Sequence, residues 1–221
     1  HYSWCLTERY ESLLDRFHFE FEVEGLEHWT LLNTKPSGFM IVTAHVGNWE
    51  IASRIPSGPE QRTMHLAREE EIDPAAQKYF QELLDSRGGS KLQTHFLGDG
   101  LGHGVELLHA LQVGDVVALQ CDRPRQSSAV VEIPFFGTSF PMPEGPAALA
   151  RAAEVPILPM FAFREGRRRY RIFFKPPIFV PRTQNRAADV CKTIDVLGEH
   201  LVWAIGREPY QWHCFVDVRD P

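Results

Sequence analysis

The sequence has few cysteines and no spacing that would indicate a covalent or metal-bound framework. Its four cysteines are Cys5, Cys121, Cys191 and Cys214, and none of them belongs to a C-x-x-C pair. Such wide separations argue against a zinc ribbon or a disulfide scaffold. We therefore expect four reduced, mostly buried thiols in a protein of the cytosolic side.

Long hydrophobic runs are also missing. No stretch of about 18 apolar residues occurs, and mean hydropathy is −0.25, so we expect no transmembrane helix in this chain. The first residue is His1 rather than Met, and no signal-peptide pattern follows it. We expect the chain to be a fragment that lacks an upstream segment.

Basic residues are outnumbered, with 23 Lys and Arg against 29 Asp and Glu, giving a net charge of −6. This balance argues against general nucleic-acid binding. The 221 residues are 43% hydrophobic and 24% charged, which are ordinary values for a globular protein. We expect one domain, spanning residues 1–221, with a single buried core.

Strand-like and helix-like patterns alternate along the chain. Apolar or alternating runs predict strands at 17–23 (half-buried), 39–42, 115–121, 156–163 and 170–174, the last two paired around a turn at Glu165 and Gly166. Helical periodicity marks 10–17, 74–84, 104–112, 143–153 and 187–205, and a helix start lies near 48–55. This order predicts an α/β fold with a central mixed, mostly parallel sheet flanked by helices.

The densest polar group beside an apolar strand is the segment T-A-H-V-G-N-W-E, which contains an H-x-x-x-x-E spacing from His45 to Glu50. On one continuous helix, residues five apart lie about 140° apart and would not share a face. If His45 ends the strand and Gly47 turns the chain, Glu50 lies in the first helical turn and can contact the imidazole. The carboxylate then fixes the tautomer and leaves the other ring nitrogen as a general base. The alternative is a His45 that caps a helix while Glu50 makes a surface ion pair.

Further segments in order strengthen this interpretation. Cys121-Asp122-Arg123 follows a strand, and Phe135-Phe136-Gly137, Pro143-Glu144-Gly145-Pro146 and the closing segment 208–213, with its P-x-Q-W pattern, come after it. With these motifs the chain, from Val23 to Phe215, resembles the bacterial lipid A late acyltransferase family. That family belongs to the lysophospholipid acyltransferase superfamily, and the resemblance implies a glycerol-phosphate acyltransferase-like fold.

The resemblance implies roles for individual residues. His45 falls on the family's general base and Glu50 on the acid that orients it. The positions that correspond to substrate binding are Asn48, Arg68, Arg87, Asp122, Phe136, Gly137 and Gly145. Arg68 and Arg87 could bind a phosphate or carboxylate, or be solvated helix-end charges, and Asp122 could instead anchor Arg87 or a loop amide. No metal and no cofactor are implied beyond an acyl thioester as co-substrate.

The sequence favours direct acyl transfer over a covalent acyl-enzyme. It contains no G-x-S-x-G elbow and no cysteine in a reactive pattern. In a direct reaction His45 takes the proton of a hydroxyl that attacks the thioester. Backbone N–H groups near Gly47 or the Arg87 guanidinium are the candidate donors to the oxyanion.

Three features depart from the family pattern or fall outside it. Arg123-Pro124-Arg125 follows Asp122 where many relatives carry an acidic or amide residue, which bears on the acceptor's identity. We also expect this chain to lack the N-terminal membrane helix of the family. Five arginines lie between residues 164 and 171. They form either a solvated hairpin tip or a contact for anionic lipid headgroups or an acidic acyl carrier protein.

The function expected is therefore transfer of a fatty acyl chain from acyl carrier protein or acyl-CoA to a hydroxyl or amine of a lipid or glycolipid acceptor. For this function we expect a protein that contacts the cytoplasmic side of the inner membrane peripherally, or one that is cytoplasmic. Two alternatives stay open. One is a thioesterase or a metal-dependent hydrolase with His45, Glu50 and Asp122 on one ion, and the other is a lipid-binding module without chemistry.

Overall fold

The computed structural model describes residues 7–8, 11, 18–49, 62–69, 73–75, 77–78, 92–97, 102–124 and 128–214. Its strands are β1 (Glu20–Glu24), β2 (Phe39–Thr43), β3 (Met64–Arg68), β4 (Leu92–Phe96), β5 (Val116–Gln120), β6 (Val130–Phe135), β7 (Thr138–Pro143), β8 (Ile157–Gly166) and β9 (Arg169–Phe174). Its helices are α2 (Leu26–Asn33), α4 (Gly102–Gln112), α5 (Gly145–Ala153), α6 (Arg186–Arg207) and the 3-10 turn η3 (Pro209–Gln211).

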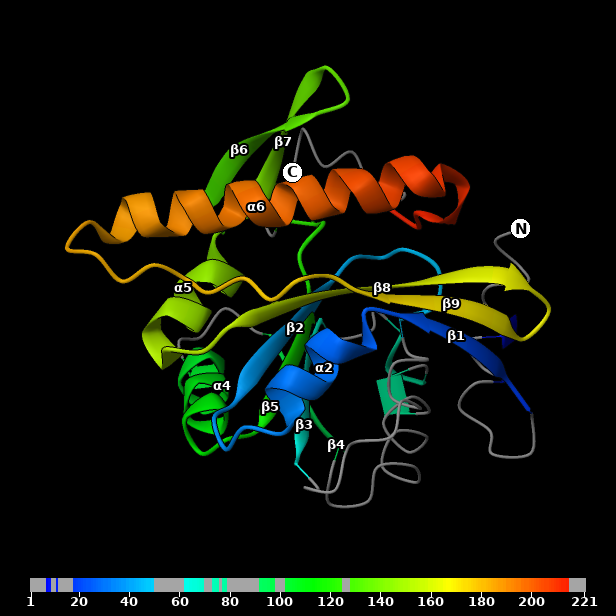
Figure 1. Ribbon diagram of the computed structural model, residues 1–221, viewed down its shortest axis with the longest axis horizontal. Helices are drawn as coiled ribbons and strands as arrows, with labels where there is room; N and C mark the ends of the chain where they lie inside the picture. The colour runs from blue at the N-terminus through cyan, green and yellow to red at the C-terminus, as the bar shows by residue number, and fades with distance from the viewer. Residues whose placement is uncertain are drawn as a thin grey trace.

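The strands form a seven-stranded sheet in the order β1-β9-β8-β2-β5-β3-β4 and a separate two-stranded ribbon of β6 and β7. In the large sheet β2 runs parallel to both β5 and β8, and β3 runs parallel to β5 and β4. The β8–β9 pair is antiparallel. The mixed, mostly parallel sheet flanked by helices confirms the predicted α/β fold (Figure 1).

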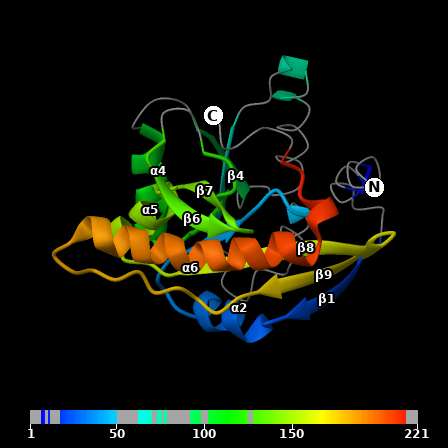
Figure 2. The same ribbon diagram turned by 90° about the horizontal axis from the view of Figure 1, so that it is seen from above.

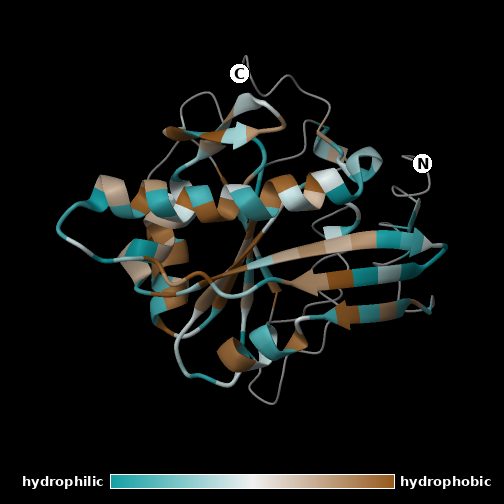
Figure 3. Ribbon diagram, turned by 45° about the horizontal axis from the view of Figure 1, so that its top comes forward, coloured by the Kyte–Doolittle hydropathy of each residue, from teal (hydrophilic) through white to brown (hydrophobic). Residues whose placement is uncertain are grey.

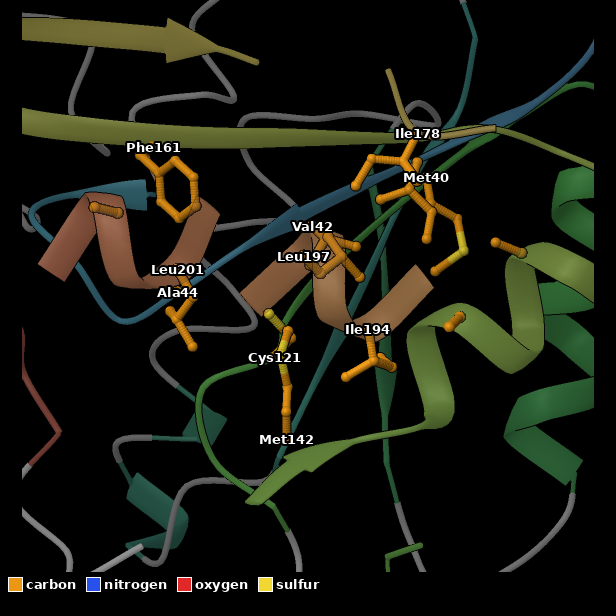
Figure 4. Packing of buried hydrophobic residues seen from close by; sticks show 14 of the residues in the cluster. Met40, Val42, Ala44, Cys121, Met142, Phe161, Ile178, Ile194, Leu197 and Leu201 are labelled. Atoms are coloured by element: carbon orange, nitrogen blue, oxygen red, sulfur yellow. The ribbon is translucent and has the colours of Figure 1, made fainter. Parts of the chain in front are cut away.

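Strand β2 is central because it is apolar on both sides, as expected of a strand inside a parallel sheet. Phe39 and Ile41 face the layer in which Trp29 of α2 is buried. Met40 and Val42 face the opposite layer, which holds the apolar sides of α4, α5 and α6 (Figure 4). The sheet is therefore covered on both faces.

Helix α6 is the longest helix among the described residues and lies along the sheet, with the β6–β7 ribbon on its other side (Figures 1 and 2). Hydrophilic and hydrophobic residues alternate along it (Figure 3). Ile194, Leu197 and Leu201 are buried on its inner face. A Cβ at Gly198 would lie 2.7 Å from the Ile133 side chain, so the glycine allows the close approach of the helix to β6.

Several predicted elements are confirmed with shifted ends. The helix expected at 104–112 begins at Gly102, and the last helix, expected at 187–205, spans Arg186–Arg207. The helix expected from Pro143 begins at Gly145, because Pro143 is the last residue of β7 and pairs with Val130. The turn expected at Glu165–Gly166 lies at 167–168, because β8 continues through Gly166.

Two expectations were wrong. The first strand was expected to be half-buried over 17–23, but β1 spans Glu20–Glu24 and all five residues are exposed, because β1 is at the edge of the sheet. The cysteines were expected to be mostly buried, but of the described ones only Cys121 is buried, while Cys191 on α6 is exposed and Cys214 is partly buried.

Other expectations fall where the structure gives no description. The predicted helix at 10–17, the helix start near 48–55, most of the helix at 74–84 and Cys5 lie outside the described residues. Within the described part of the chain, no helix combines the length and the apolar character needed to cross a membrane.

Candidate active site

His45 lies just beyond the carboxyl end of β2, in a loop that is fixed on two sides. The Gly47 N–H donates to the Gln211 carbonyl over 2.9 Å, and the His213 N–H donates to the His45 carbonyl over 2.7 Å. Gly47 has φ of +61°, and a Cβ there would lie 1.9 Å from the Ala162 carbonyl oxygen. The predicted turn at Gly47 is confirmed, and only glycine fits it.

Asp122 occupies the equivalent position after β5. The two strands are parallel neighbours with Thr43 opposite Gln120, so the residues beyond them meet at one edge of the sheet. The Asp122 Oδ1 is 2.8 Å from His45 Nδ1 and accepts the His45 backbone N–H over 3.0 Å. Its Oδ2 accepts the Trp212 Nε1–H over 2.8 Å. Both oxygens of a fully buried carboxylate are therefore hydrogen-bonded.

The electrostatics of this pair favour an ionised acid. Burial of Asp122 opposes ionisation, but the hydrogen bonds from His45 and Trp212 and the charge of His45 outweigh it and hold the Asp122 pKa below its ordinary value. An ionised carboxylate only accepts hydrogen bonds, so His45 carries its proton on Nδ1. When the ring is neutral, Nε2 is then the acceptor nitrogen, which is the state required of a general base.

The neighbouring thiol takes no part in such chemistry. Burial, together with the charge of Asp122, raises the pKa of Cys121 well above its ordinary value. The sulfur therefore stays protonated at neutral pH and is a poor nucleophile.

Arg123 continues the chain past Asp122 and contacts the other side of the imidazole. Its Nη2 lies within hydrogen-bonding distance of His45 Nε2, and its Nε is 3.4 Å from His45 Nδ1. The side chain is exposed. Sequence reasoning noted Arg123 only as a departure from a family pattern and did not predict this contact.

The segment after α6 supports the site from the other side. The Gln211 side chain accepts the Arg164 backbone N–H over 2.8 Å and donates to the Arg164 carbonyl over 2.9 Å, which fixes the segment to β8. The Trp212 ring lies 5.8 Å from the Phe135 ring and 6.4 Å from the Phe140 ring. The P-x-Q-W pattern in the sequence was the signal for this role, which sequence reasoning did not assign.

Asn48 supports the same loop from inside. Its side chain is fully buried, and its Nδ2 donates to the Tyr170 hydroxyl over 3.4 Å. That hydroxyl donates to Glu8 over 2.7 Å, and Glu8 accepts two hydrogen bonds from Arg164. The expected substrate contact of Asn48 stays a prediction, and the structure gives this side chain an inward hydrogen bond.

The remaining predicted site residues are spread over the fold. Arg68 is half-buried at the carboxyl end of β3, and Gly145 is the first residue of α5. Phe136 and Gly137 form the tight turn of the β6–β7 ribbon, both with positive φ, and the Phe136 side chain is 58% exposed. Glu50 and Arg87 lie outside the described residues, so their roles stay predictions.

Two of the backbone N–H groups expected as oxyanion donors already have partners within the chain. The N–H of Gly47 donates to the Gln211 carbonyl, and the N–H of Asn48 donates to the Ala162 carbonyl over 3.1 Å. Both groups therefore hold the loop in this structure, and the other N–H groups near Gly47 and the Arg87 guanidinium stay predictions as oxyanion donors. Among the described residues, no group of three or more His, Cys, Asp or Glu side chains is arranged to hold a metal ion.

The arginine-rich hairpin of β8 and β9 is largely neutralised within the chain. Three of its five arginines form ion pairs with described carboxylates, and Arg167 and Arg169 are exposed. The pairs are Arg164–Glu8, Arg168–Glu11 and Arg171 with Glu22, Glu24 and Glu165.

Fold and site together define an α/β protein with a histidine–aspartate pair at the carboxyl edge of a mostly parallel sheet, a geometry that allows general-base chemistry. The chain belongs to the bacterial lipid A biosynthesis acyltransferase family, whose model matches residues 9–217. The recognised resemblance is thereby confirmed.

Two curated relatives are the phosphatidylinositol mannoside acyltransferases of Mycobacterium tuberculosis strains CDC 1551 / Oshkosh and ATCC 25618 / H37Rv. Each is 25% identical to this chain over 193 residues, which is 86% of the chain and 57% of the relative. The chain thus spans a little over half the length of these relatives.

Proposed function

We propose that this protein is an acyltransferase that moves a fatty acyl chain from an acyl thioester to a hydroxyl or amine of a lipid or glycolipid. The observation that carries the proposal is the hydrogen bond from His45 Nδ1 to the buried, ionised Asp122, which makes Nε2 the basic nitrogen. Membership of a family named for acyl transfer supports it.

The reaction proceeds without a covalent enzyme intermediate. His45 Nε2 removes the proton of the acceptor hydroxyl while the oxygen attacks the thioester carbonyl carbon. The tetrahedral intermediate then collapses, the C–S bond breaks, and the proton on Nε2 passes to the leaving sulfur. The products are an ester and a free thiol. Asp122 stabilises the imidazolium between these two transfers. General-base catalysis of this kind contributes roughly 10²–10⁴-fold to the rate.

Asp122 supplies the orienting carboxylate in this proposal. The sequence pattern had assigned that role to Glu50, and the His45 Nδ1 bond to Asp122 makes a second acceptor on the same nitrogen unnecessary. Glu50 lies outside the described residues, and its orienting role stays a prediction.

The substrates are proposed at the level of chemical class. The donor is acyl carrier protein or CoA carrying a fatty acyl thioester. The names of the mycobacterial relatives support a mannosylated phosphoinositide or a related glycolipid as acceptor. Such an acceptor resides in a membrane, so the proposal includes peripheral contact with the cytoplasmic side of the inner membrane.

The test combines purified protein with a palmitoyl thioester and a panel of lipid acceptors, followed by mass spectrometry of the lipids. We expect an acceptor mass increased by one acyl group, with no loss of activity in the presence of a chelator. Release of free fatty acid at a rate that does not depend on the acceptor would instead identify a thioesterase. Comparing lipids of cells with and without the gene would then identify the natural acceptor and the chain length.

A further inference from the structure

The guanidinium of Arg123 lies where the acceptor hydroxyl of the proposed reaction must bind. Its Nη2 contacts His45 Nε2, the nitrogen that is left as acceptor once Nδ1 donates to Asp122. An imidazole nitrogen has a single lone pair, so it accepts one strong hydrogen bond at a time. While Arg123 donates to Nε2, a hydroxyl group cannot.

Arg123 is not held there by a carboxylate of the described residues. The adjacent Asp122 directs its oxygens away, to His45 and to Trp212. The Arg123 side chain is exposed, and among the described residues it forms hydrogen bonds with the His45 ring. A neutral imidazole is a weaker partner for a guanidinium than an anion, which forms charge-assisted and often bidentate hydrogen bonds.

We propose that Arg123 caps the base of the free enzyme and leaves it when it binds a phosphate group of a substrate. This proposal rests on the proposed function. It adds a regulation of the His45 base that acyl transfer itself does not require. A phosphate draws the guanidinium away from Nε2, and the lone pair becomes accessible to the acceptor hydroxyl. Arg123 thus makes the availability of the base depend on a phosphate-bearing substrate.

Two substrates could supply this phosphate. The donor carries one in the phosphopantetheine arm that acyl carrier protein and CoA share, and a phosphoinositide acceptor carries one beside its sugar. We therefore compare palmitoyl-phosphopantetheine with palmitoyl-pantetheine, and a mannosylated phosphatidylinositol with the matching mannosyl diacylglycerol. In each pair only the phosphate differs.

In the wild type, removing the phosphate from the responsible substrate should lower kcat/KM by about 10- to 100-fold, the loss expected for hydrogen bonds to a charged group. In Arg123→Gln the two members of that pair should differ by less than about 3-fold, since the coupling has been removed. Arg123→Lys should give an intermediate ratio because it keeps the charge without the planar fork. The substrate pair whose kcat/KM difference disappears in Arg123→Gln shows whether the donor or the acceptor supplies the phosphate.

Arg186→Gln is the matched control, because it removes one exposed positive charge from the start of α6, at the opposite end of that helix from the site. It should keep the phosphate dependence of the wild type. If Arg123→Gln also keeps that dependence for both pairs while transfer itself persists, the inference is overturned and the proposed function stands.

A second measurement does not depend on activity. In protein labelled with ¹⁵N-histidine, adding inorganic phosphate or phosphopantetheine at constant pH and ionic strength should shift the His45 Nε2 resonance, because its hydrogen bond from Arg123 is lost. The assignment comes from the signal that His45→Gln removes. A resonance that stays fixed in the wild type, or shifts equally in Arg123→Gln, would contradict the cap. If the wild type transfers no acyl group at all, the proposed function fails, and this measurement still decides the fate of the cap.

Discussion

Asp122 accepts two hydrogen bonds from His45, one from its backbone N–H over 3.0 Å and one from its ring Nδ1 over 2.8 Å. One carboxylate oxygen therefore fixes both the main chain and the side chain of the same residue. The ring can neither rotate nor change tautomer without breaking a bond to a buried charge, so the base is preorganised before substrate binds.

Replacing Asp122 with Asn should lower kcat by roughly 10²–10⁴-fold with little change in KM, because the amide cannot stabilise the imidazolium. Steady-state kinetics with a palmitoyl thioester measures this. Asp189→Asn is the control, since Asp189 is an equally buried acid that binds Arg151 and Thr183 near the start of α6. It should lower the melting temperature and leave kcat of the folded protein unchanged. Equal kcat in the two variants would remove Asp122 from the catalytic machinery.

The lowered pKa of Asp122 also predicts a specific acid sensitivity. An Asp in an unfolded chain has a pKa of about 3.9, and the folded value lies below it. The stabilisation is therefore fully present above that unfolded value and is lost as the pH falls through the folded pKa. Urea unfolding of wild type and Asp122→Asn over a pH series should show a difference in unfolding free energy that shrinks in this acid range. A difference that is constant with pH would contradict the assignment.

Gly47→Ala should destabilise the protein by more than about 2 kcal/mol, because the new Cβ would meet the Ala162 carbonyl and φ is positive. Gly104→Ala is the matched control on α4, where a Cβ meets no atom within 4 Å. It should stabilise by roughly 0.5 kcal/mol, because alanine loses less entropy in a helix. Thermal unfolding of both variants measures the difference in stability. Two similar melting temperatures would contradict the close packing of the His45 loop against β8.

The sequence predicted the central strands and the long helices because their patterns are strong. Phe39–Thr43 is entirely apolar apart from its last residue, and α6 carries a long amphipathic repeat. Strand β3 and strand β4 were missed because their sequences, MHLAR and LQTHF, mix polar and apolar residues and show neither an apolar run nor strict alternation. The β6–β7 ribbon was missed because it contains Pro134, Pro141 and Pro143, which argue against a strand; a two-stranded ribbon tolerates them because it has two free edges.

The site was predictable in part. His45 was named from the H-x-x-x-x-E spacing and Asp122 from the family resemblance, as a substrate-binding residue or a structural anchor. The bond between the two side chains was not foreseen. The two residues are 77 positions apart, and they meet only because β5 lies next to β2, with β3 and β4 placed beyond it. That strand order is a property of the whole sheet and leaves no local signal. The sequence prediction named Glu50 as the partner because it is only five residues from His45. Glu50 lies outside the described residues, so that assignment stays a prediction beside the observed bond to Asp122.

Cys121 should be dispensable for the chemistry although it adjoins Asp122. Its pKa is raised by burial and by that carboxylate, so it remains a thiol. Cys121→Ala should keep kcat within about 3-fold, because the proposed reaction forms no acyl-enzyme. In the folded wild type, iodoacetamide should label the exposed Cys191 well before Cys121. A palmitoyl adduct on Cys121, found by peptide mass spectrometry, would contradict direct transfer.

The central claim is that the His45 imidazole is the general base, and the most direct measurement is the rate of acyl transfer by His45→Ala and His45→Gln. Circular dichroism and thermal unfolding should first show that the variants are folded, with His45→Gln keeping a hydrogen-bonding group beside Asp122. We predict that kcat falls by roughly 10²–10⁴-fold in both, and that added imidazole restores part of the activity of His45→Ala. A folded His45 variant that transfers acyl groups at the wild-type rate would contradict the account.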